Sequence, residues 1–367
     1  MNPRYQDTQP TAEALDWAEL VTLDLSLLEQ PNGLEKLAKE LEYAANHVGF
    51  FYVQSLDISK EEVDRQFEIA QDFFSLPLEE RLQYFDREKY MSGQNIGYRP
   101  ITWRPPLDGV YDNTQIYSIP AFDGHHIHHH PDVVARCLEE IQQFQVKCDK
   151  IIQQLLQILE HVLELPPFAL RKKIRANASS EQQLRYMHYT ARNPEENEKM
   201  GHIYAGGHTD LGVLTLLFRQ PVAGLQIQNA EGEWRWVQPR DDALTVNICD
   251  ALSMISCQHL KSTIHRVHAP PADQRHLDRI GVLYFGRFSN DEYLDPLADS
   301  GVLRRAGNLQ TELSKNGIRM TMGEYAAARG AQHSRRKQPL AVGKDGRYEW
   351  DQKDLAVTST LSVQYYN

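Results

Sequence analysis

The segments Gly207-His208-Thr209-Asp210 and Ile264-His265-Arg266-Val267 decide how this chain is interpreted. Side chains two residues apart on a strand point to the same face, so His208 and Asp210 are expected to reach one point inside a barrel. His265, on a later strand, would add a third side chain from across the sheet. The sequence therefore predicts that His208, Asp210 and His265 converge.

Two imidazoles and one carboxylate are a ligand set with a specific use. Placed on one face of a metal ion they leave the opposite positions open, as in the facial triad of non-haem Fe(II) oxygenases. Open positions matter because such a metal must bind an organic co-substrate and dioxygen side by side. An HxD pair alone is weak evidence in a chain with 15 histidines. The combination of HxD, a later HRV and then Arg279 is specific, and it predicts Fe(II) at His208, Asp210 and His265.

The residues around these motifs are of types and patterns that favour β-strands. Short runs rich in β-forming residues predict strands at 184–191, 213–218, 224–228, 234–238, 244–248, 252–256, 261–268 and 279–288. The stretch 224–238, with a glycine-containing connection, indicates a hairpin. Eight short strands after a helical N-terminal third predict a mainly β protein with flanking helices, with an antiparallel barrel or jelly roll as its core.

Apolar residues at three- and four-residue steps predict helices at about 34–48, 63–74 and 132–163. Gly49 stands where a glycine would end the first of these helices, and short strands are expected at 20–25 and 50–53. No internal repeat or long linker divides the chain, so we predict one domain over 1–367. Its expected parts are a helix-rich region (about 20–180), a β core (about 181–290), C-terminal helices (about 291–330) and an irregular tail (331–367).

Composition narrows the possible partners. The 367 residues include 39 Lys+Arg and 50 Asp+Glu, a net charge of −11, and 41% are hydrophobic. The apolar content excludes a wholly disordered chain, and the acidic balance argues against a nucleic-acid partner.

The N-terminus lacks the pattern of a secretory signal, and no apolar run approaches the ~18 residues that span a membrane. Four cysteines without a CxxC motif are expected to be reduced, so we predict a cytoplasmic protein without a membrane partner. The oligomeric state stays open.

At this point the chain resembles the isopenicillin N synthase-like family of Fe(II)/2-oxoglutarate-dependent dioxygenases, over roughly residues 20–330. The segments that carry the resemblance are VTLDLS (21–26), ANHVGFFYV (45–53), FFSLPLEER (73–81), LRYMHYTA (184–191), GGHTDLGVLTLLFR (206–219), GLQI (224–227) and STIHRV (262–267). The resemblance implies a double-stranded β-helix core with Fe(II) at His208, Asp210 and His265, and 2-oxoglutarate and O2 as co-substrates.

The family binds the far carboxylate of 2-oxoglutarate through an Arg-x-Ser pair and a tyrosine. The segment DRIGVLYF (278–285) occupies that place, so the resemblance implies Arg279, with Tyr189 as the tyrosine. A planar guanidinium can hold a carboxylate bidentately. Gly281 stands at the serine position, which removes one hydrogen bond, worth about 1 kcal/mol; a Gly281→Ser change is expected to be tolerated. The later Arg287-Phe288-Ser289 is a rival Arg-x-Ser.

Other histidines and aromatic residues compete for functional roles. The tract Gly124–His130 contains five histidines and lies between Pro120 and Pro131. His-rich tracts can bind metals, but this one lies outside the expected barrel strands, and we predict a surface loop. His268 is expected to face away from the triad, and Trp234 and Trp236 to serve packing.

Candidate substrate contacts come from the segment between the N-terminal helices and the barrel, which touches substrate in relatives. Its counterpart here comprises 97–99 and 112–117, and within it we name Arg99 and Tyr117. A C-terminal helix around Met322–Arg329 is expected to close the pocket as a lid.

The resemblance implies a dioxygenase that hydroxylates, desaturates or cyclises a small organic molecule in specialised metabolism. Two alternatives remain at this stage. Gly281 leaves open a 2-oxoglutarate-independent Fe(II) oxidase of the isopenicillin N synthase type. The other is a non-catalytic binding protein on the same scaffold.

Overall fold

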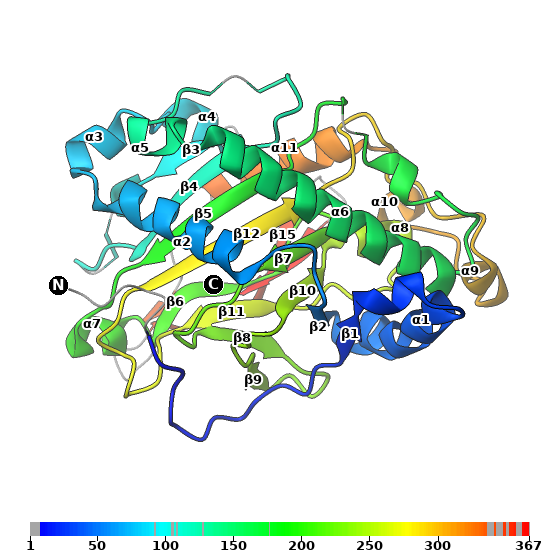
Figure 1. The fold of residues 1–367 in the computed structure, drawn as a ribbon, viewed down its shortest axis with the longest axis horizontal. Coiled ribbons are helices and arrows are strands. Elements are labelled where there is room, and N and C mark those ends of the chain that lie inside the picture. Colours follow the sequence, from blue (N-terminus) through cyan, green and yellow to red (C-terminus); the bar gives the residue numbers. More distant parts are fainter. Residues whose placement is uncertain are drawn as a thin grey trace.

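The computed structural model describes residues 8–335, except 92, 104–105, 108, 127 and 176, together with short strands between 341 and 366 (Figure 1). Two largely antiparallel sheets form its centre, with one parallel strand pair at the edge of the larger sheet. The larger sheet contains, in order, β1 (Thr22–Asp24), β2 (Phe50–Gln54), β10 (Leu244–Ile248), β7 (Leu214–Leu217), β12 (Arg279–Gly286), β5 (Gln183–Tyr189), β4 (Thr114–Pro120) and β3 (Gly97–Arg99). The smaller sheet contains β6 (Ile203–His208), β11 (His265–His268), β8 (Leu225–Gln228) and β9 (Trp234–Trp236). This confirms the mainly β jelly-roll core with flanking helices.

The alternation of side chains along β12 separates the core from the interior of the barrel. Val282 and Tyr284 are fully buried on the outer face, and the Tyr284 hydroxyl donates a 2.7 Å hydrogen bond to Asp149. Arg279, Leu283 and Phe285 point the other way, into the space between the sheets. Since successive residues on a strand face opposite sides, one sequence supplies both a packed core and a polar cavity wall.

Two long amphipathic helices cover the outer face of the large sheet (Figure 1), α2 (Lys60–Ser75) and α6 (Leu138–Val162). A capping box between Ser59 and Glu62 begins α2, and it satisfies backbone N–H groups that would otherwise lack partners. The helix α1 (Gly33–Tyr43) continues as a π-helical turn and ends at Gly49, whose φ of 73° suits glycine. These three helices confirm the predictions from periodicity, except that α6 begins at Leu138 rather than at 132.

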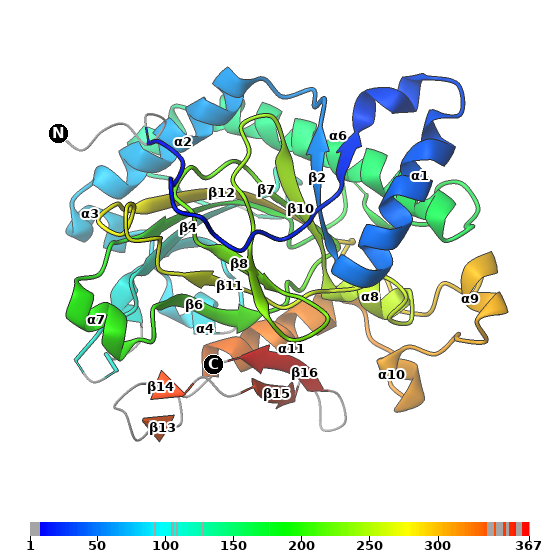
Figure 2. The same cartoon turned by 90° about the horizontal axis from the view of Figure 1, so that it is seen from below.

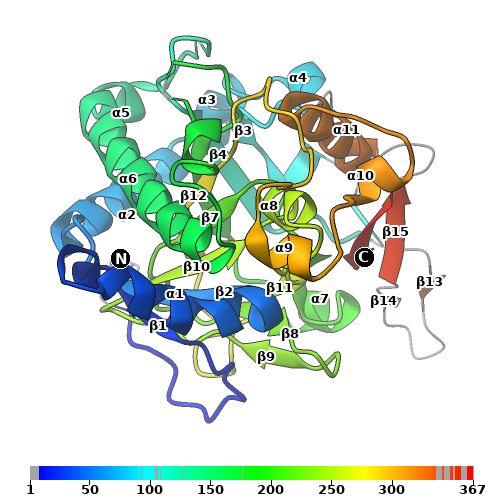
Figure 3. The ribbon, with the colours of Figure 1, turned by 90° about the vertical axis from the view of Figure 1, so that its right-hand side faces the viewer.

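The remaining helices are short, apart from the 14-residue helix at Met322–Arg335. They are α3 (Leu78–Leu82), α4 (Arg87–Met91), α5 (Asp132–Ala135), α7 (Pro194–Lys199), α8 (Asp250–Ile255), α9 (Gly301–Arg305), α10 (Glu312–Lys315) and α11 (Met322–Arg335). Three 3-10 turns lie at Leu25–Glu29, Ile101–Trp103 and Arg171–Lys173. Figure 3 shows α9, α10 and α11 on the side of the molecule away from α2. No helix of the described residues has the length and apolar character needed to cross a membrane.

Three expectations about local structure were wrong. The run 252–256 belongs to α8 rather than to a strand, because a short apolar segment buried on every side has no periodicity to distinguish the two. The expected helix 132–163 is divided into α5 and α6. A strand was expected at His208, but its extent, Ile203–His208, was not predicted, because its Ala205-Gly206-Gly207 centre has low strand propensity.

The chain beyond α11 was expected to be irregular, but its described parts are strands. These are β13 (Ala341–Val342), β14 (Tyr348–Glu349), β15 (Gln352–Ala356) and β16 (Ser362–Tyr366), paired as β13–β14 and β15–β16. Strand β16 lies against β6, and Figure 2 shows both β16 and α11 beneath that strand. The C-terminal segment therefore approaches the edge of the smaller sheet that carries His208.

Candidate metal centre and co-substrate cavity

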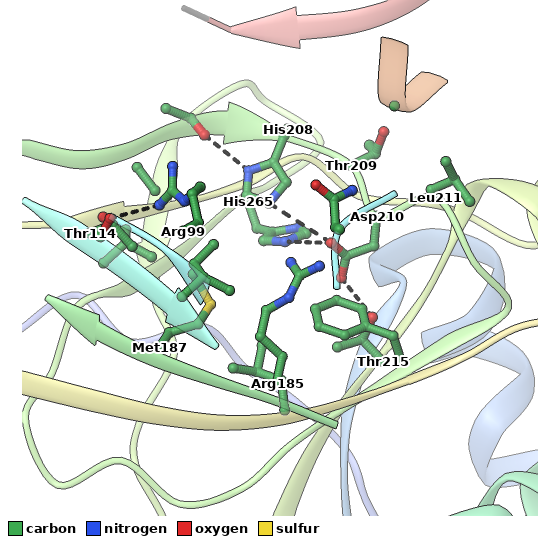
Figure 4. Close-up of a pocket in the computed structure, with 18 of the residues that line it drawn as sticks. Arg99, Thr114, Arg185, Met187, His208, Thr209, Asp210, Leu211, Thr215 and His265 are labelled. Atoms are coloured by element: carbon green, nitrogen blue, oxygen red, sulfur yellow. Dashed lines mark hydrogen bonds and ion pairs between the residues drawn. The ribbon is translucent and has the colours of Figure 1, made fainter. Parts of the chain in front are cut away.

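A cavity of about 580 Å³ lies between the two sheets. Its walls come from the inward faces of β4, β5, β7 and β12 on one side and of β6 and β11 on the other. This volume is within the range of small-molecule sites in proteins. The three residues predicted to bind a metal all lie on its surface (Figure 4).

His208 and His265 reach the cavity from paired strands. His208 ends β6, His265 begins β11, and the two are directly opposite in the register. Asp210 Oδ1 lies 3.8 Å from His208 Nε2 and 3.7 Å from His265 Nε2. All three ligand atoms lie within 4.8 Å of one another, and no other group of three such side chains occurs in the described part of the chain.

The structure brings the predicted triad together, but by a different local geometry. Both His208 and Asp210 were expected on one strand. Strand β6 ends at His208, and Asp210 follows in a turn that directs its carboxylate back toward the imidazoles. The convergence therefore depends on the turn after β6 as well as on side-chain alternation.

Hydrogen bonds fix which nitrogen of each imidazole is available. Nδ1 of His208 lies 2.9 Å from the Gly206 carbonyl, and Nδ1 of His265 lies 3.1 Å from the Thr263 carbonyl. A carbonyl oxygen only accepts, so each Nδ1 must carry the proton and donate it. Each Nε2 then presents its lone pair on the side of Asp210, which is the orientation that metal-binding histidines require.

The Asp210 carboxylate is held in an ionised and oriented state. Its Oδ2 accepts hydrogen bonds from Thr215 Oγ1 at 2.7 Å and Asn247 Nδ2 at 3.0 Å, which leaves Oδ1 for the imidazoles. Burial alone would raise the pKa of Asp210, but the positive charges of His265 and His208 in their protonated forms and the two hydrogen bonds lower it to about 2. Two neutral nitrogens and one carboxylate, without a thiolate, are a donor set that fits Fe(II) with open positions.

Arg279 and Tyr189 lie at one end of the cavity. They are directly opposite in the β12–β5 register, and the guanidinium lies 5.2 Å from the centre of the Tyr189 ring. Arg279 is only 3% exposed, and its Nε donates to the Val222 carbonyl at 3.1 Å. Among the described residues no carboxylate pairs with this guanidinium, so its charge is available to a bound anion. The sequence correctly placed these two side chains together.

The serine position of the family is filled from elsewhere in the chain. A Cβ atom added at Gly281 would lie 2.4 Å from Nε2 of Gln220, which follows β7. Gln220 is 5% exposed, lines the cavity, and its Oε1 has no hydrogen-bond partner within the described part of the chain. Sequence reasoning missed Gln220 because it lies in no motif. The side chain of Gln220 occupies the space that a serine at Gly281 would need, so the flexible end of Gln220 would have to move aside. That serine is tolerated at this position stays a prediction.

Of the two substrate candidates, only Arg99 reaches the cavity. Its guanidinium is engaged by Asp112 at 3.2 Å and by the Thr114 carbonyl at 2.8 Å. Tyr117 is completely buried on the opposite face of β4, where it stacks on Phe73 at 4.0 Å. The expectation for Tyr117 was wrong because the odd positions of β4 face the helices.

The His-rich tract is only partly the surface loop that was predicted. His125 and His129 are exposed. In contrast, the Nδ1 atom of His130 lies 2.8 Å from the Tyr117 hydroxyl, and the His130 ring packs edge-on against the His128 ring with 4.8 Å between their centres. Burial lowers the pKa of both His128 and His130 to about 4. None of the described histidines of this tract joins a three-residue metal cluster.

His268 and the C-terminal helix behave as expected in position. His268 stacks on His202 at 5.8 Å, away from the triad. Helix α11 contributes the small residues Gly323, Ala326, Ala327 and Gly330 to the cavity wall, together with Arg329. Arg329 ties it to the barrel through Asp250 at 2.9 Å and the Thr209 carbonyl at 3.3 Å. That α11 closes over substrate stays a prediction.

An antiparallel double-stranded β-helix with a His-x-Asp…His cluster in its cavity defines a mononuclear non-haem iron oxygenase. Residues 20–109 match the family described as the non-haem dioxygenase in morphine synthesis N-terminal, and residues 180–287 match the 2OG-Fe(II) oxygenase superfamily. The chain belongs to the 2OG-Fe(II) oxygenase superfamily. It is an Fe(II)/2-oxoglutarate-dependent dioxygenase, with Fe(II) as cofactor and 2-oxoglutarate and O2 as co-substrates.

Named relatives include 2-oxoglutarate-dependent dioxygenases and a scopoletin hydroxylase. The 2-oxoglutarate-dependent dioxygenase gloE of Glarea lozoyensis is 30% identical over 278 residues, covering 74% of this chain and 80% of the relative. Scopoletin 8-hydroxylase of Arabidopsis thaliana is 26% identical, covering 81% and 78%. A full-length Neurospora crassa protein solved in complex with alpha-KG is 22% identical, has a TM-score of 0.74, and covers 88% of this chain and 100% of that one.

Proposed function

We propose that His208, Asp210 and His265 hold Fe(II), that Arg279, Tyr189 and Gln220 receive the distal carboxylate of 2-oxoglutarate, and that the enzyme oxidises a small organic molecule. The main support is that the ligand atoms of these three residues lie within 4.8 Å of one another. The same cavity contains Arg279, a buried arginine that no described carboxylate neutralises.

The roles of the three ligands follow from their hydrogen bonds. His208 and His265 would donate Nε2 lone pairs, because their Nδ1 protons are bound to backbone carbonyls. Asp210 would supply the negative charge, with Thr215 and Asn247 keeping its free oxygen toward the imidazoles. When bound, the iron would supply dioxygen activation coupled to oxidative decarboxylation of 2-oxoglutarate.

The co-substrate would be held at the far end by a cation and two neutral donors. The Arg279 guanidinium matches a carboxylate in shape and charge, and Tyr189 lies directly opposite it. The Gln220 amide, in the space of the family serine, would donate the hydrogen bond that a serine hydroxyl otherwise makes. Gly281 therefore does not favour the 2-oxoglutarate-independent alternative.

The substrate class is proposed from the cavity and the relatives. A volume of about 580 Å³ suits a small organic molecule beside 2-oxoglutarate. One relative is a scopoletin hydroxylase, and the Neurospora crassa protein has been solved with thymine. We propose a role in specialised metabolism, with hydroxylation, desaturation and ring closure as possible outcomes.

The four buried, unbridged cysteines support a location in a reducing compartment, the cytoplasm. The net charge of −11 supports the absence of a nucleic-acid partner.

Anaerobic titration calorimetry tests the proposal. The wild-type protein should bind Mn(II) and then 2-oxoglutarate, and with Fe(II), O2 and a substrate it should release succinate. Absence of metal binding would favour a binding protein. Metal binding and substrate oxidation without succinate would favour a 2-oxoglutarate-independent oxidase.

A further inference from the structure

The cavity wall is rich in arginine although the chain is acidic. Among the lining residues that the structure describes there are six arginines, Arg99, Arg185, Arg192, Arg279, Arg287 and Arg329. The same wall has three carboxylates, Asp112, Glu181 and Asp210. Burying a cation away from water is costly unless an anion or hydrogen-bond acceptors compensate it. The partner of each arginine therefore indicates what the cavity binds.

Four of the six arginines have an evident partner or role. Arg99 pairs with Asp112 at 3.2 Å, and Arg329 pairs with Asp250 at 2.9 Å. Arg192 donates to the Ile203 carbonyl at 2.8 Å. Arg279 is assigned to 2-oxoglutarate by the proposed function. Arg185 and Arg287 remain.

Arg287 is a buried cation to which the described residues offer no ion-pair partner. It is 9% exposed, and its Nε is buried without a hydrogen bond to any of them. Its side chain passes Gly212, two residues from Asp210, where a Cβ would lie 3.2 Å from Arg287 Cγ. Burial lowers the pKa of Arg287, and Glu181 opposes that effect. An arginine guanidinium is not deprotonated in proteins, so Arg287 is charged beside the proposed metal centre.

Arg185 reaches the same region from the neighbouring strand. Figure 4 shows its guanidinium directed toward Asp210 and His265. Its hydrogen bonds go to neutral groups, Ser118 Oγ at 3.1 Å and Gln183 Oε1 at 3.3 Å. Burial, with a smaller contribution from Arg287, lowers the pKa of Arg185 to about 10, so it stays charged at neutral pH.

Strand register separates this pair from the co-substrate site. Arg185 is opposite Leu283, Arg279 precedes Leu283 by four residues, and Arg287 follows it by four. Eight residues of strand span roughly 26 Å, far more than a five-carbon dicarboxylate. A 2-oxoglutarate molecule anchored at Arg279 therefore does not reach Arg287, on which Glu181 and Asp210 act without forming an ion pair in the described structure.

We propose that the substrate is a small monocarboxylic acid whose carboxylate binds between Arg185 and Arg287, beside the metal centre. The inference rests on the proposed function. Two guanidinium groups offer forked donors that match a planar carboxylate. Glu181 lines the same wall and offsets one of the two positive charges, which favours a monoanion over a phosphate dianion.

The test uses the full chain loaded anaerobically with Mn(II) and 2-oxoglutarate. The probes are aliphatic and aromatic monocarboxylic acids, each with its primary amide and the phosphate monoester of the matching alcohol. Thermal shift selects binders, and calorimetry gives each Kd. We expect acids to bind at least tenfold more tightly than their amides. Arg287→Gln and Arg185→Gln should each reduce that preference at least tenfold, and Arg287→Lys should retain part of it. Arg319→Gln, which removes an exposed arginine paired with Asp295, is the matched control.

The 2-oxoglutarate Kd of each variant serves as a check on folding and on the co-substrate site, and it should change less than twofold. If Arg185→Gln does not fold, Arg287→Gln decides alone. Amides that bind as well as acids across the panel, a preference for phosphate monoesters, or a loss of 2-oxoglutarate affinity in Arg287→Gln would each overturn the inference. Wild-type protein that binds neither Mn(II) nor 2-oxoglutarate would instead contradict the proposed function, and the inference with it.

Discussion

His208 and His265 are direct partners across the β6–β11 ladder, and their ring centres lie 4.4 Å apart. Two residues 57 positions apart in the chain thus become neighbours through one strand pairing. Each donates its Nδ1 proton to a carbonyl two residues earlier on its own segment, Gly206 for one and Thr263 for the other. The pairing therefore fixes both the separation and the orientation of the two imidazoles.

Removing one triad ligand should abolish metal binding. Asp210→Ala or His265→Gln leaves two protein ligands, and Asp210→Glu misplaces the carboxylate that Thr215 and Asn247 hold. We expect at least a 100-fold weaker affinity for Mn(II) by anaerobic calorimetry, together with loss of succinate formation. His268→Gln is the matched control, since His268 stacks on His202 away from the cluster. Normal metal affinity in Asp210→Ala would contradict the assignment of the triad.

Arg279 should control affinity for 2-oxoglutarate. Truncating one partner of a buried charge pair costs roughly 2–5 kcal/mol, and Arg279 is the buried cation opposite Tyr189. Arg279→Gln should raise the Kd of 2-oxoglutarate at least tenfold in the Mn(II)-loaded protein, measured by anaerobic calorimetry. Affinity for Mn(II) itself should be unchanged. An unaffected 2-oxoglutarate Kd would show that another cation holds the distal carboxylate.

Gly281 and Gln220 should be energetically coupled. Gln220→Ala removes the amide from the serine position, and the loss of one hydrogen bond worth about 1 kcal/mol predicts a fivefold weaker 2-oxoglutarate affinity. Gly281→Ser alone should also weaken binding, because its Cβ meets Gln220 Nε2 at 2.4 Å. The double variant should recover affinity, since the serine then has space and replaces the amide.

A double-mutant cycle measures this coupling. Four Kd values for 2-oxoglutarate, from wild type, the two single variants and the double variant, are sufficient. Additive effects, with no recovery in the double variant, would show that Gln220 does not act in place of the serine.

His130 should make stability depend on pH in the acidic range. Burial lowers its pKa to about 4, from an unperturbed value of 6.5. The unfolded chain therefore takes up a proton at a pH where the folded protein does not, so stability falls as the pH drops from about 6.5 to about 4. His130→Gln should flatten this dependence. Urea unfolding at several pH values measures it, with the exposed His129→Gln as control; identical curves for wild type and His130→Gln would contradict it.

The sequence by itself determined the ligand types of the proposed metal centre and the main helices that surround the barrel. Helices α1, α2 and α6 follow from local periodicity, because burying one face of a helix requires apolar residues at fixed steps. The donor set of His208, Asp210 and His265 is a property of side-chain chemistry, which needs no coordinates. The Arg279–Tyr189 pair was also predictable, through the resemblance to a family.

Only the tertiary structure decided which face each side chain takes and what fills the space beside it. Tyr117 was assigned to the substrate although it faces the helices, because a shift of one residue in a strand reverses every side chain and only the pairing sets that register. Gln220 reaches Gly281 from 61 positions away, and Arg185 lies on the strand next to the one that ends just before Arg287. Such contacts are absent from local sequence because they arise from the close packing of segments distant in the chain.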